Sequence, residues 1–162
     1  MKYKIINDAL SQEEFIKIKN LLLGCYFPWF YIPAVSQKSA KDGFYLNHVF
    51  FGVEPHKTNS DYFDSLKPIL KILKPKALIR VKGNFYPQTK KLESHDQHAD
   101  YSFPHKGAIF AINTCDGYTL LKKSIKIDSK ENRLLLFDPS IPHNSTTCTN
   151  EHGRININFN YF

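Results

Sequence analysis

The stretch RININFNYF closes the chain, and its residues 154–161 alternate strictly between polar and apolar side chains. Arg154, Asn156, Asn158 and Asn160 share one parity, and isoleucine, phenylalanine and tyrosine share the other. Because successive side chains of a β-strand point to opposite faces, this pattern predicts a strand with one polar and one apolar face. The fold must therefore contain a sheet whose two faces meet different surroundings.

Strand patterns also occupy the preceding third of the chain. Residues 77–86 alternate, and residues 107–113 are apolar on both faces, as in a buried central strand. Asp116-Gly117 predicts a tight turn, and short strands are predicted at 124–127 and 133–137. Many short strands at regular spacing are typical of a β-sandwich or barrel.

Two helices are predicted before these strands. Ser11 and Glu14 match a capping box, and apolar residues then recur at helical spacing up to Gly24. A second helical segment covers residues 60–73, where Pro68 forces a kink or a restart.

Between the helices, residues 25–43 are expected to be irregular and residues 44–53 to form a strand. The predicted fold is mainly β (α+β), with the N-terminal helices packed on one sheet. A chain of 162 residues suits a single domain, with a helical or irregular part over 1–76 and a strand-rich core over 77–162.

Composition limits the cellular setting and the partners. Three widely spaced cysteines without a CxxC pair predict free thiols in a reducing compartment, and neither a signal peptide nor a run of ~20 apolar residues is visible. We therefore expect a cytoplasmic protein without a membrane partner. The net charge of +7 comes from scattered lysines, which favours a solvated surface over a nucleic-acid-binding face.

The segment HDQHADYSFPH, residues 95–105, concentrates three histidines and two aspartates. If residues 98–100 form a strand, His98 and Asp100 face the same side and can occupy adjacent positions around one metal ion. The His-x-Asp pattern alone is a weak signal, because chance produces it in a chain of this composition. His95 and His105 are expected at the surface or behind the ligands rather than on the metal.

A third ligand is predicted near the other end of the chain. RLLLFDPSIPH, residues 133–143, runs a buried strand into a proline-bounded turn that delivers His143. If His143 pairs with the 98–100 segment, two histidines and one carboxylate converge and leave an open face. This set suits non-haem Fe(II), but a zinc site with an open position uses the same residue types.

Arg154 bears on that choice. It is one of three arginines and occupies the polar face of the last strand. A guanidinium there can bind a carboxylate bidentately, although a surface arginine on an edge strand remains the alternative.

Taken in order, His98-x-Asp100, His143 and Gly153-Arg154 resemble the 2-oxoglutarate- and Fe(II)-dependent oxygenases, specifically their prolyl-4-hydroxylase-like branch. The resemblance covers residues 77–162, and small single-domain forms encoded by phages look similar over nearly the whole chain. It implies a double-stranded β-helix, or jelly roll. If the protein is phage-encoded, the compartment would be the host cytoplasm.

The resemblance also implies the roles of the site residues. His98, Asp100 and His143 would hold Fe(II), and Arg154 would bind the far carboxylate of 2-oxoglutarate, assisted by Tyr86 and, less strongly, by Asn156. With O2, the enzyme would convert 2-oxoglutarate to succinate and hydroxylate a substrate C–H bond. The branch points to a prolyl residue in a peptide or protein, while a small molecule or a nucleic-acid base also fits.

Two departures from the family pattern affect the substrate side. Tyr118 follows Gly117 where the family usually has a second glycine, and Asn156 stands where serine or threonine is common. Two other functions stay open. A cupin-like metal-binding barrel would have no use for Arg154, and a zinc hydrolase would need an acid or base that the sequence does not supply. The sequence indicates neither the oligomeric state nor the role of the aromatic segment 26–31, which includes Trp29, Phe30 and Tyr31.

Overall fold

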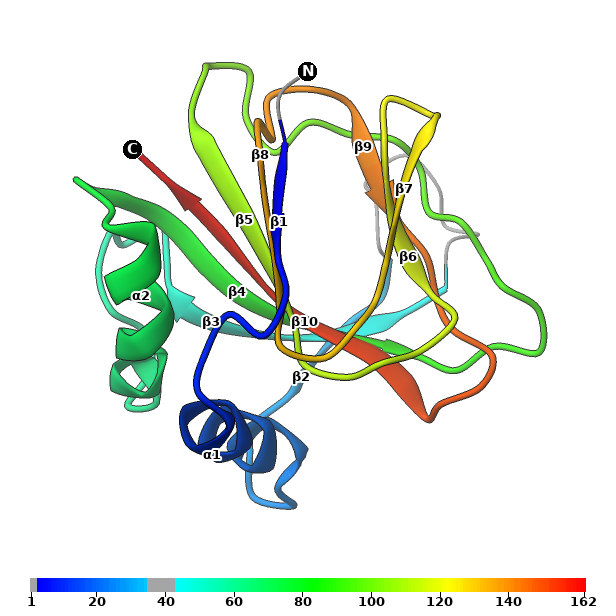
Figure 1. Ribbon diagram of the computed structural model, residues 1–162, viewed down its shortest axis with the longest axis horizontal. Coiled ribbons are helices and arrows are strands. Elements are labelled where there is room, and N and C mark those ends of the chain that lie inside the picture. Colours follow the sequence, from blue (N-terminus) through cyan, green and yellow to red (C-terminus); the bar gives the residue numbers. More distant parts are fainter. Residues whose placement is uncertain (1–2, 35–42) are drawn as a thin grey trace.

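The structure is a computed structural model that describes residues 3–34 and 43–162 (Figure 1). Two antiparallel sheets dominate it, one of seven strands in the order β1-β8-β5-β10-β4-β3-β2 and one of three in the order β7-β6-β9. The large sheet contains β1 (Lys4–Ile6), β2 (Phe30–Ile32), β3 (Tyr45–Phe51), β4 (Leu78–Pro87), β5 (Lys106–Ala111), β8 (Arg133–Phe137) and β10 (Gly153–Tyr161). The small sheet contains β6 (Tyr118–Leu121), β7 (Ile125–Asp128) and β9 (His143–Ser145).

The helices cover the outer face of the large sheet. Figure 1 shows α1 (Gln12–Leu23) and α2 (Lys67–Leu73) on the side away from β6, β7 and β9. Their buried side chains join those of the large sheet in one core, whose members include Phe15, Leu66, Phe110 and Phe159. The predicted packing of N-terminal helices on one sheet is confirmed.

The last strand, β10, lies in the middle of the large sheet between β4 and β5. Its apolar side chains pack toward the helices, where Ile155 and Ile157 belong to the main core. Its polar side chains face the small sheet, since Arg154 contacts Thr119 of β6. The alternation therefore separates the helix-covered core from the space between the two sheets.

Helix α1 begins as predicted. The Ser11 hydroxyl accepts a hydrogen bond from the Glu14 N–H at 3.3 Å and donates one to Glu14 Oε2 at 2.9 Å. The second helical segment restarts as expected: a 3-10 turn, η1 (Phe63–Leu66), precedes α2, which has Pro68 in its first turn. Proline fits there because the first helical N–H groups have no partner within the helix.

Three short strands were not predicted: β6 in the small sheet, and β1 and β2 in the large one. β1 and β2 are each three residues long and form the two edges of the large sheet. Three residues cannot display an alternation, so only pairing with β8 and β3 reveals them. The expectation that residues 25–43 are irregular is thus wrong at Phe30–Ile32, and its part over 35–42 lies outside the described residues.

Strands from before residue 77 share the large sheet with the strands after it, because β1 pairs with β8 and β3 pairs with β4. The assignment of a single domain, with an N-terminal part over 1–76 and a core over 77–162, stays a prediction. Among the described residues, neither helix is long and apolar enough to cross a bilayer.

Candidate metal centre

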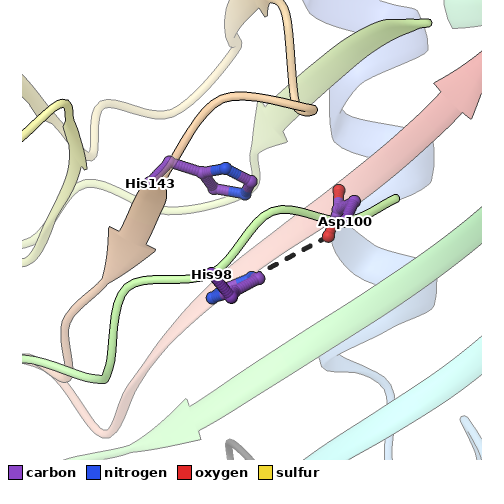
Figure 2. Close-up of side chains that lie close together, drawn as sticks. All are labelled: His98, Asp100 and His143. Atoms are coloured by element: carbon purple, nitrogen blue, oxygen red, sulfur yellow. Dashed lines mark ion pairs between the residues drawn. The ribbon is translucent and has the colours of Figure 1, made fainter. Parts of the chain in front are cut away.

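The structure brings His98, Asp100 and His143 together between the two sheets. One potential ligand atom from each lies within 4.8 Å of the others. Figure 2 shows His143 at the start of β9, with His98 and Asp100 on the segment between β4 and β5. The side chain of His98 is 44% exposed, whereas that of Asp100 is 5% exposed, so the group opens toward solvent on the His98 side.

A backbone bridge creates the convergence. The His98 N–H donates to the His143 carbonyl and the His143 N–H to the His98 carbonyl, both at 2.9 Å. A pair that exchanges both hydrogen bonds presents its side chains on one face, and the two rings lie 4.7 Å apart. The strand expected for residues 98–100 is wrong, because His98 forms only an isolated bridge and Asp100 lies in a bend.

Both imidazoles are oriented by backbone carbonyls. Nδ1 of His143 lies 3.0 Å from the Ile141 oxygen, and Nδ1 of His98 lies 3.2 Å from the Asp96 oxygen. Each Nδ1 therefore carries the proton, which leaves Nε2 with a free lone pair. Burial lowers the pKa of His143, so its ring is held in the neutral form that metals bind.

Asp100 is held from two sides. Arg80 Nη2 lies 3.3 Å from its Oδ1, and the Asn158 amide donates to its Oδ2 at 3.3 Å. Burial alone would raise the pKa of Asp100, but Arg80 and the neighbouring imidazoles reverse the effect and lower it. Asp100 is thus kept as an oriented carboxylate, the form that coordinates a cation.

A line of polar side chains supports Asn158. Asn160 donates to Asn158 Oδ1 at 2.9 Å, and Nε2 of His105 lies 2.8 Å from Asn160 Oδ1. Both histidines placed outside the predicted ligand set are buried, with His95 at 6% and His105 at 7% exposure. A surface position is therefore wrong for both. His105 contacts Asn160 in this line of side chains, and Nδ1 of His95 lies 2.8 Å from the Ser145 hydroxyl oxygen.

Asn158→Ala is expected to weaken metal binding about tenfold, because outer partners that orient a ligand contribute roughly 10–100-fold to affinity. Calorimetric titration of Mn(II) into the protein measures this effect, with Asn20→Ala on the exposed face of α1 as the control. Equal affinity in both variants would mean that Arg80 alone orients Asp100.

Arg154 lies deep between the sheets at 2% exposure. Its Nη2 donates to the Thr119 hydroxyl at 2.7 Å and its Nη1 to the Thr146 carbonyl at 3.3 Å, while Nε has no hydrogen-bond partner among residues 3–34 and 43–162. None of the ion pairs found within the described residues includes it, and burial lowers its pKa. The alternative of a surface arginine on an edge strand is wrong.

Tyr86 and Asn156 lie beside Arg154. Tyr86 is directly opposite Arg154 in the β4–β10 register, and Asn156 is opposite Asn84. Directly paired residues share a face, so all four line the same space. Burial raises the pKa of Tyr86, which keeps its hydroxyl available as a donor.

A narrow cavity connects these residues with the two histidines. Its walls include Tyr86, Asn156, Asn158, Thr119, His98 and His143. Buried Oδ1 atoms of Asn84 and Asn144 also have no partner there. Sequence reasoning missed Thr119, Asn84 and Asn144, although the parity of Asn84 with Tyr86 along residues 77–86 was a usable signal.

Gly117 fits the space beside Arg154. A Cβ at this position would lie 2.5 Å from the Thr147 carbonyl oxygen and 2.7 Å from Arg154 Cδ. Such distances force the backbone or the arginine to move. A single glycine at position 117 is therefore enough for this close approach, and Tyr118 can follow it in β6.

Comparison with known proteins gives a fold but no sequence family. No protein-family model and no curated sequence matches the chain. Solved structures do match over 99% of it: the viral collagen prolyl hydroxylase of Paramecium bursaria Chlorella virus-1 in a 2-oxoglutarate complex has a TM-score of 0.66 at 11% identity and 94% coverage of its own chain. The Trichoplax adhaerens prolyl hydroxylase, with a hypoxia-inducible-factor peptide fragment, has a TM-score of 0.67 at 14% identity and 83% coverage.

A third match has a different activity. The α-ketoglutarate-dependent epimerase SnoN of nogalamycin biosynthesis has a TM-score of 0.66 at 12% identity, covering 99% of this chain and 77% of its own. The shared architecture is thus common to enzymes with different outcomes. Together with the two antiparallel sheets described above, these matches show that the chain has the jelly-roll fold of the 2-oxoglutarate- and Fe(II)-dependent oxygenases.

Proposed function

We propose that the protein is an Fe(II)- and 2-oxoglutarate-dependent dioxygenase that hydroxylates a substrate C–H bond and releases succinate. The observation that carries the proposal is the buried Arg154, which has no carboxylate partner among the described residues. It lies on the same face of β10 as Asn156 and Asn158, which line the cavity beside His98 and His143. A buried guanidinium without an anion is costly, and a bound carboxylate would offset that cost.

The donor set fits the metal. Two neutral imidazole nitrogens and one carboxylate form a three-ligand set that leaves positions free, as non-haem Fe(II) sites require. His98 Nε2, His143 Nε2 and an oxygen of Asp100 would hold the ion. Bound Fe(II) with 2-oxoglutarate and O2 would supply the oxidation of the substrate C–H bond.

The spacing of residues along β10 matches the length of the cosubstrate. Arg154 and Asn158, the residue that contacts Asp100, are four residues apart on β10, which is roughly 13 Å along a strand. A five-carbon dicarboxylate, its bonds to the metal and the arginine side chain would together span that length. Arg154, Tyr86 and Thr119 would bind the far carboxylate, and the Asn84–Asn156 pair, joined at 3.1 Å, would line its middle.

The substrate is assigned only by class. The prolyl hydroxylases among the structural matches make a prolyl residue in a peptide or protein the first to test, with small molecules second. A cytoplasmic location and a phage origin stay predictions, as does the expectation that nucleic acid is a less favoured partner. A cupin-like barrel without oxygenase activity remains the alternative, and it gives Arg154 no role.

Anaerobic calorimetry of 2-oxoglutarate with Fe(II)-loaded protein tests the proposal. We expect one binding site whose affinity depends on the metal, followed in air by succinate formation that proline-containing peptides stimulate. Absence of 2-oxoglutarate binding to the metal-loaded protein would contradict the proposal.

A further inference from the structure

Two basic side chains, Arg80 and Lys82, occupy β4 beside the candidate metal centre. Arg80 helps to orient Asp100, and Lys82 has no role in the proposed chemistry. Lys82 is opposite Asn158 and Arg80 is opposite Asn160 in the β4–β10 register. Because paired residues share a face, both point to the side of the large sheet that carries Asp100. Arg154 is paired further along β4, with Tyr86, so the two basic residues lie on the same face of the large sheet but at the opposite end of β4 from Arg154.

Lys82 is a poorly compensated charge. Its Nζ lies 3.3 Å from the Tyr45 hydroxyl and 5.3 Å from the centre of the Tyr45 ring. Among the described residues, no carboxylate forms an ion pair with it. Burial lowers the pKa of Lys82 to about 8, with the charge of Arg80 adding to the effect. The side chain is still mostly charged at neutral pH, and it lacks the partner that a desolvated ammonium needs.

Arg80 is only partly satisfied. One nitrogen contacts Asp100 at 3.3 Å, and the guanidinium lies 5.5 Å from the Tyr101 ring centre. The buried Nε has no hydrogen-bond partner in the part of the chain that the structure describes. The guanidinium is a fork with several donors, so binding Asp100 leaves donors for a second anion.

A count of charges around the metal centre gives an excess of positive charge. With the proposed ligands bound, the two positive charges of Fe(II) and the one of Arg154 equal the two negative charges of 2-oxoglutarate and the one of Asp100. Arg80 and Lys82 then remain as two positive charges without a counterpart. Positive charges beside a dication site also weaken metal binding, so their presence needs a compensating function.

We propose that Arg80 and Lys82 bind an anionic group of the substrate, a carboxylate or a phosphate, beside the metal centre. This inference rests on the proposed function and narrows its substrate class. The rings of Tyr45 and Tyr101 flank the two cations and would bound the anion site on its apolar sides. A substrate with an anion close to the reacting carbon would then be preferred over its neutral counterpart.

Small anions test the site without knowledge of the substrate. Protein loaded with Mn(II) and 2-oxoglutarate, under anaerobic conditions, is titrated by calorimetry with acetate and separately with methyl phosphate. We expect saturable binding of at least one anion at one site, weakened about tenfold or more in Lys82→Met and retained in Lys82→Arg. Tighter acetate binding would assign a carboxylate-bearing substrate, and tighter methyl phosphate binding a phosphorylated one.

Lys130→Met removes an exposed lysine and serves as the charge-matched control, for which wild-type binding is expected. Lack of saturable binding of either anion to the wild type would overturn the inference, as would binding that Lys82→Met leaves unchanged, which would place the anion on the metal. Titration of 2-oxoglutarate into the same Mn(II)-loaded samples separates the two proposals. If 2-oxoglutarate binds and the small anions do not, only the anion site fails.

Discussion

Replacing Arg154 with methionine is expected to weaken 2-oxoglutarate binding to the metal-loaded protein by at least ~30-fold. The guanidinium is buried at 2% exposure and keeps an unpaired Nε, so a carboxylate bound there would form a desolvated ion pair. Truncating one partner of such a pair costs on the order of 2–5 kcal/mol, or about 30-fold to several thousandfold in affinity. Calorimetry with wild type and variant under identical metal loading measures the difference.

Stability separates this role from a structural one. Exchange of a buried, uncompensated charge for an apolar side chain of similar length is often neutral or stabilising, so the metal-free Arg154→Met variant should unfold at or above the wild-type denaturant midpoint. Arg133→Met, which removes a guanidinium that contacts Asn7 and the Asp128 carbonyl, is the control and should keep wild-type 2-oxoglutarate affinity. Destabilisation by Arg154→Met with unchanged binding would favour the cupin-like alternative.

Replacing His143 with alanine is expected to abolish the stabilisation that a metal ion gives the protein. A ligand at about 100 times its dissociation constant raises the free energy of unfolding by ~2.7 kcal/mol. Loss of one of three ligands should exceed the roughly 100-fold effect of losing an outer partner, so the variant should gain almost nothing at the same metal concentration. Denaturant unfolding with and without Mn(II) measures both proteins.

The control for His143→Ala is His56→Ala, which removes an exposed imidazole bonded to the Leu78 carbonyl. This variant should retain the full metal-dependent increase. A metal-dependent increase that survives in His143→Ala would show that the ion binds elsewhere and would remove the basis for the His98–Asp100–His143 centre.

The strand pattern of the second half of the chain was readable because it depends on local geometry. Side chains alternate along any strand, so RININFNYF predicted β10, and the predicted strands at 77–86, 107–113, 124–127 and 133–137 correspond to β4, β5, β7 and β8. The capping box at Ser11 was readable for the same reason, since it needs only residues within one helical turn. Three-residue edge strands such as β2 carry no such signal.

For the candidate site, sequence order supplied the residue types and tertiary structure supplied the neighbours. His98, Asp100, His143 and Arg154 could be singled out because their chemistry and order resemble a known pattern. The single bridge between His98 and His143, rather than the expected strand, sets their distance. Asp100 contacts Arg80, which is 20 positions away in the sequence, and Asn158, which is 58 positions away. No local sequence pattern reveals such contacts.

The sequence by itself determined which face of the last strand is polar, because alternation is a property of the extended backbone. Only the tertiary structure decided what that face meets. β10 became a central strand with its polar face toward the small sheet, so Arg154 and Asn156 were buried, and Asn156 and Asn158 line a cavity. Burial leaves these charged and amide groups in need of partners, and it arises from the packing of the two sheets against each other, which a local sequence pattern does not specify.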